Sequence, residues 1–377
     1  MTGYPEELLA WAYLARVAEP PCAEVIELVD AMGPTDAASA IRRRSVPDGF
    51  DPVLAVTAAR HDSECAADDL DAAAQVGARL VTRSDPEWPA WSLLALGQAD
   101  TAARGGEPLA LWVRGPARLD ELVADSLALI GSRAASDYGR HVTGMLASGL
   151  SAEGFSVISG GAFGIDGVAH KAVVAGGGMT AAVMACGIDR DYPASHSALL
   201  GEIARTGAVI SEYPPGTTAA RHRFLTRNRL VAALSGGTIV VEAGRRSGAA
   251  NTAAWARKLG RPLGAVPGPV TSSTSVGCHR MIADGLAVLV ADVASAVNLV
   301  RPDGGGDVGR GRLKPTDGLT EEQLRVHDAI PARGGVGIEE IAFAAGLEVP
   351  VVRAALARLD VGGLVENAGG RWKLSTG

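Results

Sequence analysis

The feature that most limits what this chain can fold into lies within residues 126–170. There, two short apolar segments are each followed by a glycine-containing loop and then by a helical pattern. The first, Leu127–Ile130, leads into a loop that starts at Gly131, and the second, Phe155–Ile158, leads into the loop 159–166. This pattern is typical of two consecutive βα units of a parallel sheet. Ligands bind at the carboxyl ends of such strands, because free backbone amides and helix N-termini point there.

Further strand-like segments extend this pattern into a large α/β domain. Apolar runs that alternate with helical segments follow at Thr180–Ala185, Ala208–Ile210, Thr238–Val241, Leu263–Val266 and Ala287–Val290. We therefore predict an α/β fold, with an extended Rossmann-like, doubly wound parallel sheet over residues 119–301. The preceding strand patterns, at Ala78–Thr82 and Ala110–Val113, are expected to dock onto the edge of this sheet.

The chain is predicted to have four parts. These are a small helical module similar to SAM or helix-hairpin-helix units (1–65), the Rossmann-like domain with its lead-in (66–301), a flexible glycine-rich linker (302–318) and a winged helix (319–377). From Leu319 onward, the chain has six Lys and Arg residues and eight Asp and Glu residues, so this part carries a net negative charge. Since electrostatics supplies most non-specific affinity, we expect this last part to contact protein rather than to read duplex DNA.

Composition excludes several classes of protein. The formal net charge of −7 argues against a protein that coats nucleic acid over its whole surface, although it allows a local basic strip. The four cysteines are far apart, which favours buried, reduced thiols over disulfides or a metal site. The acidic N-terminus and the absence of a long apolar run predict a cytoplasmic protein with no membrane contact.

A basic segment follows the strand pattern at Ala208–Ile210. Between Arg221 and Arg246 the chain has six arginines and a single carboxylate, Glu242. Phe224 lies among these arginines, and such a mixture holds single-stranded nucleic acid, because cations neutralise phosphates while the ring stacks on a base. The alternative is that Phe224 belongs to the core and that the arginines pair with Glu212 and Glu242.

Catalytic signals are weak. Asp166 and His170 lie one helical turn apart, but no zinc-protease, nucleophile-elbow or Walker A motif is present. His170 is therefore interpreted as a hydrogen-bonded helix residue. The glycine loop alone does not predict a dinucleotide, because the next strand ends in Ala185-Cys186 rather than in an acidic residue. We predict no catalytic residue, no cofactor and no metal.

Several motifs run in order through the main domain. They are Gly131-Ser132-Arg133, Ser136-x-Tyr138-Gly139-Arg140, Ser159-Gly160-x-Ala162-x-Gly164-Ile165-Asp166-x-x-Ala169-His170, Tyr192-Pro193, Ser211-Glu212-Tyr213-Pro214-Pro215-Gly216, Phe224-x-x-Arg227-Asn228-Arg229, Val241-Glu242-Ala243 with Ser247-Gly248, and Val266-Pro267-Gly268. Taken together, these motifs resemble the DNA-processing protein A (DprA/Smf) family. Two departures are Leu225, where the family usually has proline, and Cys278-His279, where it usually has Gly-x-Asn.

This resemblance implies a protein that binds single-stranded DNA without sequence preference, forms a homodimer and loads the RecA recombinase during natural transformation, without catalytic turnover. The residues predicted to contact DNA or its phosphates are Gly131, Ser132, Arg133, Gly160, Gly161, Gly164, Lys171, Arg221, Phe224, Arg227 and Asn228. Those predicted to shape the rim of the site are Asp166, His170, Glu242, Ser247 and Gly248.

Two other functions stay open from the sequence. The first is a Rossmann-like nucleotide phosphoribohydrolase, since Gly236-Gly237-Thr238 followed by Glu242 preserves part of the run that such enzymes use. The second is a transcription regulator whose sheet binds a phosphorylated effector and whose winged helix reads DNA.

Overall fold

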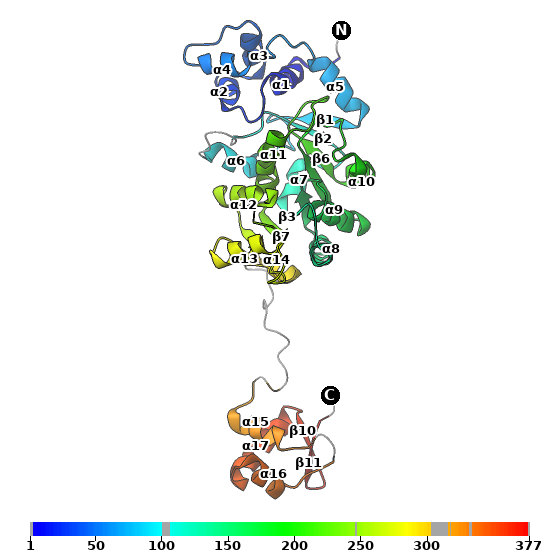
Figure 1. Cartoon of the computed structure of the whole chain (residues 1–377), viewed down its shortest axis with the longest axis vertical. Coiled ribbons are helices and arrows are strands. Elements are labelled where there is room, and N and C mark those ends of the chain that lie inside the picture. The colour runs from blue at the N-terminus through cyan, green and yellow to red at the C-terminus, as the bar shows by residue number, and fades with distance from the viewer. Residues whose placement is uncertain are drawn as a thin grey trace. The chain divides into compact units, whose positions relative to one another are not determined.

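The computed structural model describes residues 3–99, 106–245, 247–302, 316, 318–331 and 334–375. The chain forms two compact units, Met1–Gly306 and Asp307–Gly377, each of which is described by itself (Figure 1). Most of the linker predicted over residues 302–318 lies outside the described residues.

The larger unit is built on one nine-stranded sheet with the order β1-β2-β6-β5-β4-β3-β7-β8-β9. Its strands are β1 (Ala78–Val81), β2 (Leu111–Arg114), β3 (Ser126–Gly131), β4 (Ser156–Ser159), β5 (Thr180–Met184), β6 (Ala208–Ser211), β7 (Gly237–Glu242), β8 (Leu263–Ala265) and β9 (Val288–Leu289). All pairs from β6 to β9 are parallel, whereas β2 pairs antiparallel with β6, and β1 with β2. The predicted parallel sheet and its lead-in at the edge are confirmed.

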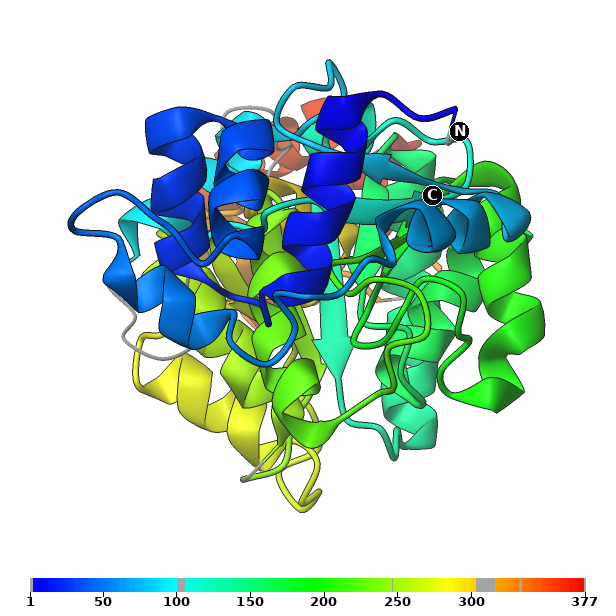
Figure 2. The ribbon, with the colours of Figure 1, turned by 90° about the horizontal axis from the view of Figure 1, so that it is seen from above.

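Helices cover both faces of this sheet (Figure 2). One face carries α8 (Asp137–Ala152), α9 (Ile165–Ala175), α10 (Ser197–Thr206) and α14 (Val293–Asn298), and the other carries α6 (Ala90–Gln98), α7 (Leu119–Ala124), α11 (Arg221–Ala233), α12 (Gly248–Lys258) and α13 (Val276–Ala283). Along β3, Leu127 and Leu129 pack into the first layer, and Ala128 and Ile130 into the second. Because both faces are buried, the strands are apolar throughout rather than alternating.

The N-terminal helices pack against the antiparallel end of the sheet (Figure 1). They are α1 (Glu6–Val17), α2 (Ala23–Met32), α3 (Pro34–Arg42), α4 (Asp51–Val56) and α5 (Ala66–Gln75). Their buried side chains, such as Trp11 and Leu14, share one core with Trp112 of β2 and Met184 of β5. The helical module is therefore attached to the sheet by a continuous apolar core.

Three consecutive arginines, Arg42, Arg43 and Arg44, lie at the end of α3, and two of them contact other residues of the N-terminal module. The Arg42 guanidinium lies 4.0 Å from the centroid of the Tyr13 ring. Arg44 donates to the Thr57 hydroxyl at 3.1 Å and to the Leu54 carbonyl. Two of the three arginines are thus engaged inside the module.

The smaller unit contains the elements predicted for a winged helix. They are α15 (Glu321–Asp328), α16 (Ile338–Ala345), α17 (Val349–Val361) and the hairpin of β10 (Val365–Ala368) with β11 (Arg371–Leu374). A bridge between Val336 and Trp372 adds a further backbone pairing to this hairpin. Its core is formed by residues such as Val326, Ile341 and Leu356.

The cysteines are all free, but one expectation about them is wrong. Cys22, Cys186 and Cys278 are buried, whereas Cys65 is exposed, because it lies at the surface where α5 begins. Among the described helices, none combines the length and the apolar character needed to cross a membrane.

Candidate functional site

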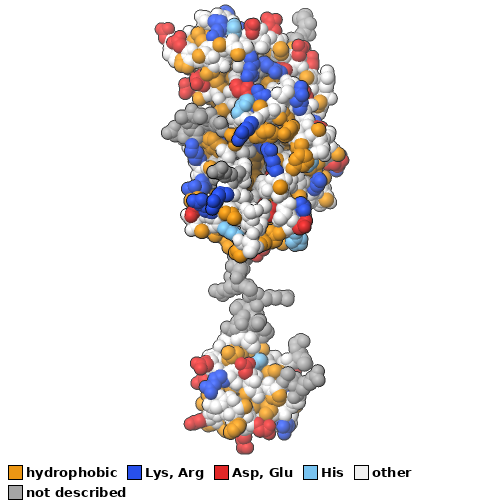
Figure 3. Space-filling view, in the orientation of Figure 1, with side chains coloured by type: hydrophobic (Ala, Val, Ile, Leu, Met, Phe, Trp, Pro, Cys, Tyr) orange, Lys and Arg blue, Asp and Glu red, His pale blue; other side chains and the backbone are white. Residues whose placement is uncertain are grey.

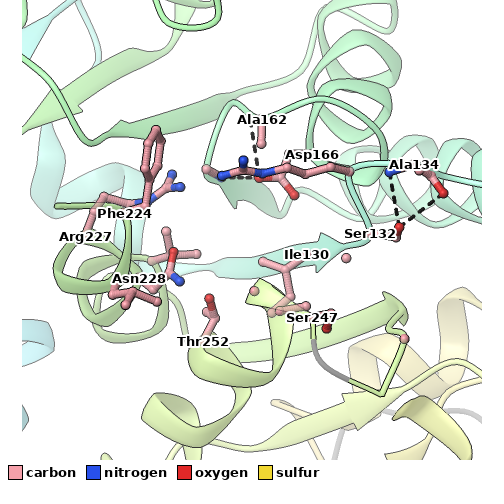
Figure 4. Close-up of a pocket in the computed structure, with 18 of the residues that line it drawn as sticks. Ile130, Ser132, Ala134, Ala162, Asp166, Phe224, Arg227, Asn228, Ser247 and Thr252 are labelled. Atoms are coloured by element: carbon pink, nitrogen blue, oxygen red, sulfur yellow. Dashed lines mark hydrogen bonds between the residues drawn. The ribbon is translucent and has the colours of Figure 1, made fainter. Parts of the chain in front are cut away.

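A large pocket opens where the strand order reverses. The chain runs outward from β3 through β4, β5 and β6 and then returns to place β7 on the other side of β3. Loops at this point diverge and leave a crevice at the carboxyl ends of the strands. The crevice has a volume of about 1320 Å³, and Figure 4 shows Phe224, Arg227 and Asn228 along one part of its wall, with Ser247 and Thr252 along another.

Most of the predicted site residues meet in this crevice. Of the residues predicted to contact DNA or to shape the rim, those that line the crevice are Gly131, Ser132, Arg133, Gly160, Asp166, Arg221, Phe224, Arg227, Asn228, Ser247 and Gly248. Gly164 and Lys171 line a neighbouring pocket of about 700 Å³, which Arg133 also lines. Gly161, His170 and Glu242 line neither and lie behind the walls of these pockets.

Arg133 and Phe224 form the exposed centre of the site. Arg133 is exposed, and its guanidinium carbon lies 5.1 Å from the centroid of the half-buried Phe224 ring. The Tyr192 ring lies next to Phe224, with 5.3 Å between the ring centroids. In the described part of the chain, Arg133 has no ion-pair partner. A planar cation and two rings are therefore available to a ligand.

The remaining arginines of α11 divide into different roles. Arg221 is exposed at the start of the helix. Arg223 donates to Glu19 of the N-terminal module at 2.8 Å. Arg229 is fully buried in an ion pair with Glu212, with 2.7 Å between nitrogen and oxygen. The alternative reading of the arginines as ion-pair partners is thus correct for Arg229 but not for Arg221. Arg246, which belonged to the same predicted cluster, lies outside the described residues.

Glu19 connects the N-terminal module to the start of α11. Its carboxylate accepts from Arg223 and Arg60 and lies 3.4 Å from the His222 ring nitrogen. Burial alone would raise the pKa of Glu19, but hydrogen bonds and charge from the two arginines outweigh it and lower the pKa to about 2. The carboxylate is therefore ionised over the whole physiological range and holds the helix end that carries Phe224.

Arg227 lies in the floor of the crevice rather than at its surface. The side chain is 4% exposed, and its guanidinium donates to the Val183 carbonyl. Burial lowers the pKa of Arg227, and the charge of Asp166 opposes this effect. Gly160 leaves room for this guanidinium, because an added Cβ there would displace it. A direct phosphate contact through Arg227 stays a prediction.

Asp166 accepts hydrogen bonds from two backbone amides that were predicted from the sequence to be free. Its carboxylate accepts from the amides of Gly160 at 3.2 Å and Ala162 at 3.4 Å. The expectation that the whole glycine loop offers open amides to phosphate is corrected for these two positions. Burial raises the pKa of Asp166, and Arg227 and these amides counter that effect.

The loops after β3 and β4 are held together through their backbones. The Ile165 amide donates to the Ser132 carbonyl at 3.1 Å, and Gly164 has a φ of 75°. A side chain at Gly164 would be strained and would also overlap the backbone of Arg133. The position of Arg133 is thus fixed by close contact between the two loops.

Two buried histidines lie behind the site, and one of them, His196, contacts the loop after β4. His170 contacts the Thr180 hydroxyl at 2.8 Å, as expected for a hydrogen-bonded helix residue. His196 contacts the carbonyl of Gly161 at 3.0 Å, so Gly161 serves to hold this ring. Burial lowers the pKa of His170 to about 3, and the charges of His196 and Arg227 add to the effect.

Glu242 is a structural carboxylate. It is 1% exposed and accepts from the Ser136 amide at 3.0 Å, the Ser136 hydroxyl at 2.5 Å and the Thr274 hydroxyl at 2.8 Å. These donors tie the start of α8 to the loop before α13. A phosphoribohydrolase would need this carboxylate at the substrate, so its burial argues against that alternative.

The departure at Cys278-His279 is compensated. The His279 ring nitrogen lies 2.9 Å from the carbonyl of Gly268 and 3.3 Å from its amide. Histidine therefore provides a polar contact to the Val266-Pro267-Gly268 loop in place of the usual asparagine. Cys278 itself is fully buried.

Some residues of the site were missed by sequence reasoning. Tyr192, Phe163 and Arg140 line the crevice or the pockets beside it, although only Phe224 was assigned as a ring for stacking. A signal was available, since Phe163 and Tyr192 both occur in loops that follow predicted strands. In the view of Figure 3, hydrophobic side chains lie among Lys and Arg around a hollow in the larger unit.

The accessible charged groups that line the site are all cations. They are Arg133, Arg140, Lys171, Arg221 and Arg245, and the accessible apolar groups include aromatic rings. Within the described ranges, no group of three or more His, Cys, Asp or Glu residues is arranged to hold a metal ion. Cations beside rings suit a polyanion that carries flat, unpaired bases.

Comparison with known proteins agrees with this description. The family model described as DNA recombination-mediator protein A matches residues 79–301. A DNA processing protein DprA from Mycobacterium tuberculosis is 49% identical over 97% of this chain and 94% of its own length. The DNA processing protein DprA of Streptococcus pneumoniae is 38% identical over 49% of this chain and 64% of its own.

Solved structures are similar as well. The crystal structure of DNA processing protein A from Streptococcus pneumoniae superimposes with a TM-score of 0.63 and 28% identity, over 78% of this chain and 97% of that chain. The protein of the same name from Helicobacter pylori, described for its single-stranded DNA binding mode, gives a TM-score of 0.51 and 26% identity, over 60% of this chain and 96% of its own.

Proposed function

This chain belongs to the DNA recombination-mediator protein A family, and we propose that it binds single-stranded DNA without reading its sequence. The observation that carries this proposal is the exposed Arg133 guanidinium beside the Phe224 ring, at the mouth of the crevice. The cation neutralises a phosphate while the ring stacks on a base, and every base offers a face for stacking.

Further cations extend the path of the strand. Lys171 and Arg140 line the pocket on one side of Arg133, while Arg221 and Arg245 line the crevice on the other. A backbone that follows these cations releases counterions from several phosphates, which makes the affinity strongly dependent on salt. Binding is expected without catalytic turnover, since Glu242, Asp166 and His170 are buried in structural contacts.

A comparison of three ligands tests this proposal. In a filter-binding experiment at fixed salt, the protein should retain single-stranded DNA more strongly than duplex of the same length and far more strongly than a mononucleotide. The rings cannot reach bases that are paired and stacked, and one nucleotide lacks the row of phosphates. Equal affinity for duplex would contradict the role of the rings, and preference for the mononucleotide would indicate a nucleotide-binding protein.

A second measurement tests the use of phosphates. The logarithm of the binding constant should fall linearly with the logarithm of the salt concentration, with a slope of about −0.7 for each phosphate neutralised. Homopolymers of different bases should give similar slopes. A binding constant that does not change with salt would contradict a backbone held by cations.

We further propose that the chain acts as a homodimer that loads the RecA recombinase onto the strand during natural transformation. Support comes from the family description, a DNA recombination mediator, and from the DNA processing proteins to which the chain is similar. Two grooves in a dimer would hold a strand at two points and leave the segment between them open to the recombinase.

The rate of RecA filament formation measures this activity. RecA should form filaments on single-stranded DNA coated with a single-strand-binding protein faster when this chain is added. Arg133→Ala should reduce the stimulation together with DNA binding. Sedimentation over a range of protein concentrations reports whether the chain is a dimer, and a monomer at all concentrations would remove that part of the proposal.

A further inference from the structure

A tryptophan is exposed on α6, on the face of the sheet that also carries α11 and α12. The Trp91 side chain is 83% exposed, and no other aromatic side chain in the described part of the larger unit is as open to solvent. Leu94, one helical turn further on, is 44% exposed, whereas Leu93 and Leu96 bury the inner side of the helix. Grouped exposed apolar residues mark an interaction site, so Trp91 and Leu94 have the character of a contact surface.

The chain that follows β7 is basic throughout. Residues 243–283 contain six Lys and Arg residues and no Asp or Glu, although the whole protein has a net charge of −7. Two of these cations, Arg257 and Lys258, are exposed in the last turn of α12. Within the described ranges, Arg257 has no ion-pair partner. A local excess of cations in an acidic protein attracts a polyanion to that surface.

Arg261 brings the start of α6 to the end of α12. Its guanidinium donates to the carbonyl of Ser92, the residue after Trp91, at 3.3 Å, and to the carbonyl of Ala233 at the end of α11 at 3.4 Å. Because Arg261 closely follows the last turn of α12, the exposed ring and the cations of α12 form one surface (Figure 1). We call this surface the α6–α12 patch, and its residues are Trp91, Leu94, Arg257, Lys258 and Arg261.

Helix α12 connects this patch with the crevice. Gly248, Ala249 and Thr252, in the first half of the helix, line the crevice, whereas the patch lies at its other end. A helix of 11 residues is about 16 Å long, which a few nucleotides can span. Ala250 and Ala254 are exposed between the two ends. A strand that leaves the crevice can therefore follow α12 without meeting a bulky or acidic side chain of that helix.

We propose that the α6–α12 patch is a second contact for single-stranded DNA, where a strand that leaves the crevice stacks a base on Trp91 and places phosphates on Arg257 and Lys258. This inference rests on the proposed function and extends its site toward the amino ends of the strands. Cations without neighbouring acids on α12, and a helix that starts at the crevice, favour nucleic acid over a protein partner. The exposed ring favours an unpaired strand, because its bases have free faces.

The length of the DNA tests the proposal. An oligothymidylate of about 6 nucleotides is long enough for the crevice, whereas one of about 20 nucleotides also reaches the patch. Trp91→Ala should weaken binding of the long strand by about fivefold or more, because one base loses its stacking surface. The short strand should bind as it does to the parent protein. Trp91→Phe should restore most of the affinity for the long strand.

Replacing a cation of the patch should change the salt dependence instead. Arg257→Ala should make the salt slope shallower by about 0.7 for the long strand and leave that of the short strand unchanged. Trp91→Ala should leave both slopes unchanged, since no phosphate contact is lost. The matched controls are Arg205→Ala, at an exposed position on the opposite face of the sheet, and Phe343→Ala, which removes a 92% exposed ring in the smaller unit.

The outcomes separate this inference from the proposed function. No loss for Trp91→Ala with the long strand, or an equal loss with both lengths, would overturn the second contact while binding in the crevice stands. An unchanged DNA affinity with slower RecA filament formation, or with altered sedimentation, would overturn it in favour of a protein partner or a second copy. Failure of the parent protein to bind either strand would overturn both proposals. Thermal unfolding shows whether each variant keeps the parent fold.

Discussion

The Arg133 guanidinium carbon lies 5.1 Å from the centroid of the Phe224 ring, although these residues belong to distant parts of the chain. Arg133 comes from the loop after β3, whereas Phe224 is in the first turn of α11. The contact joins an exposed cation to an aromatic ring, and it depends on the strand order, which brings the loop after β3 close to α11.

Replacing Arg133 should weaken binding to all single-stranded sequences alike. Arg133→Ala should make the salt slope shallower by about 0.7, because one phosphate contact is lost. Arg133→Lys should restore the slope but not the full affinity, since an ammonium does not stack on Phe224 as a planar guanidinium does. Fluorescence anisotropy over a salt series measures both quantities. Arg205→Ala, at an exposed position on α10, should leave binding unchanged, and a sequence-dependent loss at Arg133 would contradict the prediction.

Replacing Glu19 should weaken DNA binding indirectly. Glu19→Gln removes the charge that holds Arg223, and a partly exposed ion pair contributes about 1 kcal/mol or less, so the affinity should fall by up to about fivefold. The salt slope should stay the same, because Glu19 does not bind phosphate. Glu27→Gln, at an exposed position of α2, is the matched control for anisotropy. A changed salt slope would show instead that Glu19 acts through the electrostatic potential at the crevice.

Arg229 and Glu212 form a buried ion pair, and the stability of the fold should depend on both partners being present together. Burial raises the pKa of Glu212, and the charge of Arg229 opposes this effect. Glu212→Gln leaves the buried guanidinium without its counter-charge and should lower the free energy of unfolding by about 3–5 kcal/mol. Urea unfolding measures this difference, with Glu202→Gln on the surface as a control. Replacing both residues by Met and Leu should recover most of the loss, and a Gln variant as stable as the parent would contradict the prediction.

His170 should make the fold sensitive to acid. Burial lowers its pKa from 6.5 to about 3, so between these pH values the unfolded chain binds a proton that the folded chain does not. The contribution of His170 to the free energy of unfolding should therefore be largest above pH 6.5. As the pH falls from 6.5 to about 3, this contribution should decrease by up to about 1.4 kcal/mol per pH unit. His170→Asn keeps a partner for Thr180 and should flatten this decline.

Unfolding curves at several pH values measure the His170 effect. Asp166, whose pKa is raised by burial, gives the opposite trend in both proteins, so the difference between the curves isolates His170. His141→Asn, at an exposed position of α8, should follow the parent curve. Identical acid sensitivity of His170→Asn and the parent would contradict the prediction.

Much of the fold could be predicted because its signals are local. Short apolar runs such as Leu127–Ile130 identify buried strands, and their alternation with helices implies parallel pairing. Parallel strands share one polarity, so the loops at Gly131 and Gly160 had to reach the same edge of the sheet. The convergence of Arg133, Phe224 and Ser247 on one crevice follows from that rule.

The roles of individual arginines could not be predicted in this way. Arg221, Arg223, Arg227 and Arg229 lie on one helix, two or four residues apart. Arg221 is exposed and Arg223 pairs with Glu19. Arg227 is buried and donates to the Val183 carbonyl, and Arg229 is buried in an ion pair with Glu212. Their partners come from different elements, and one comes from the N-terminal module. The grouping of Phe163 and Tyr192 around Phe224 depends on the same long-range arrangement.

The sequence by itself determined the strands, their common direction and the loops that carry glycine and cations, because these depend on the periodicity and polarity of neighbouring residues. Only the tertiary structure decided which charges stay exposed to a ligand and which are neutralised inside the protein. The reason is physical: burial and ion pairing depend on side chains that the strand order brings together, and no local pattern records that order.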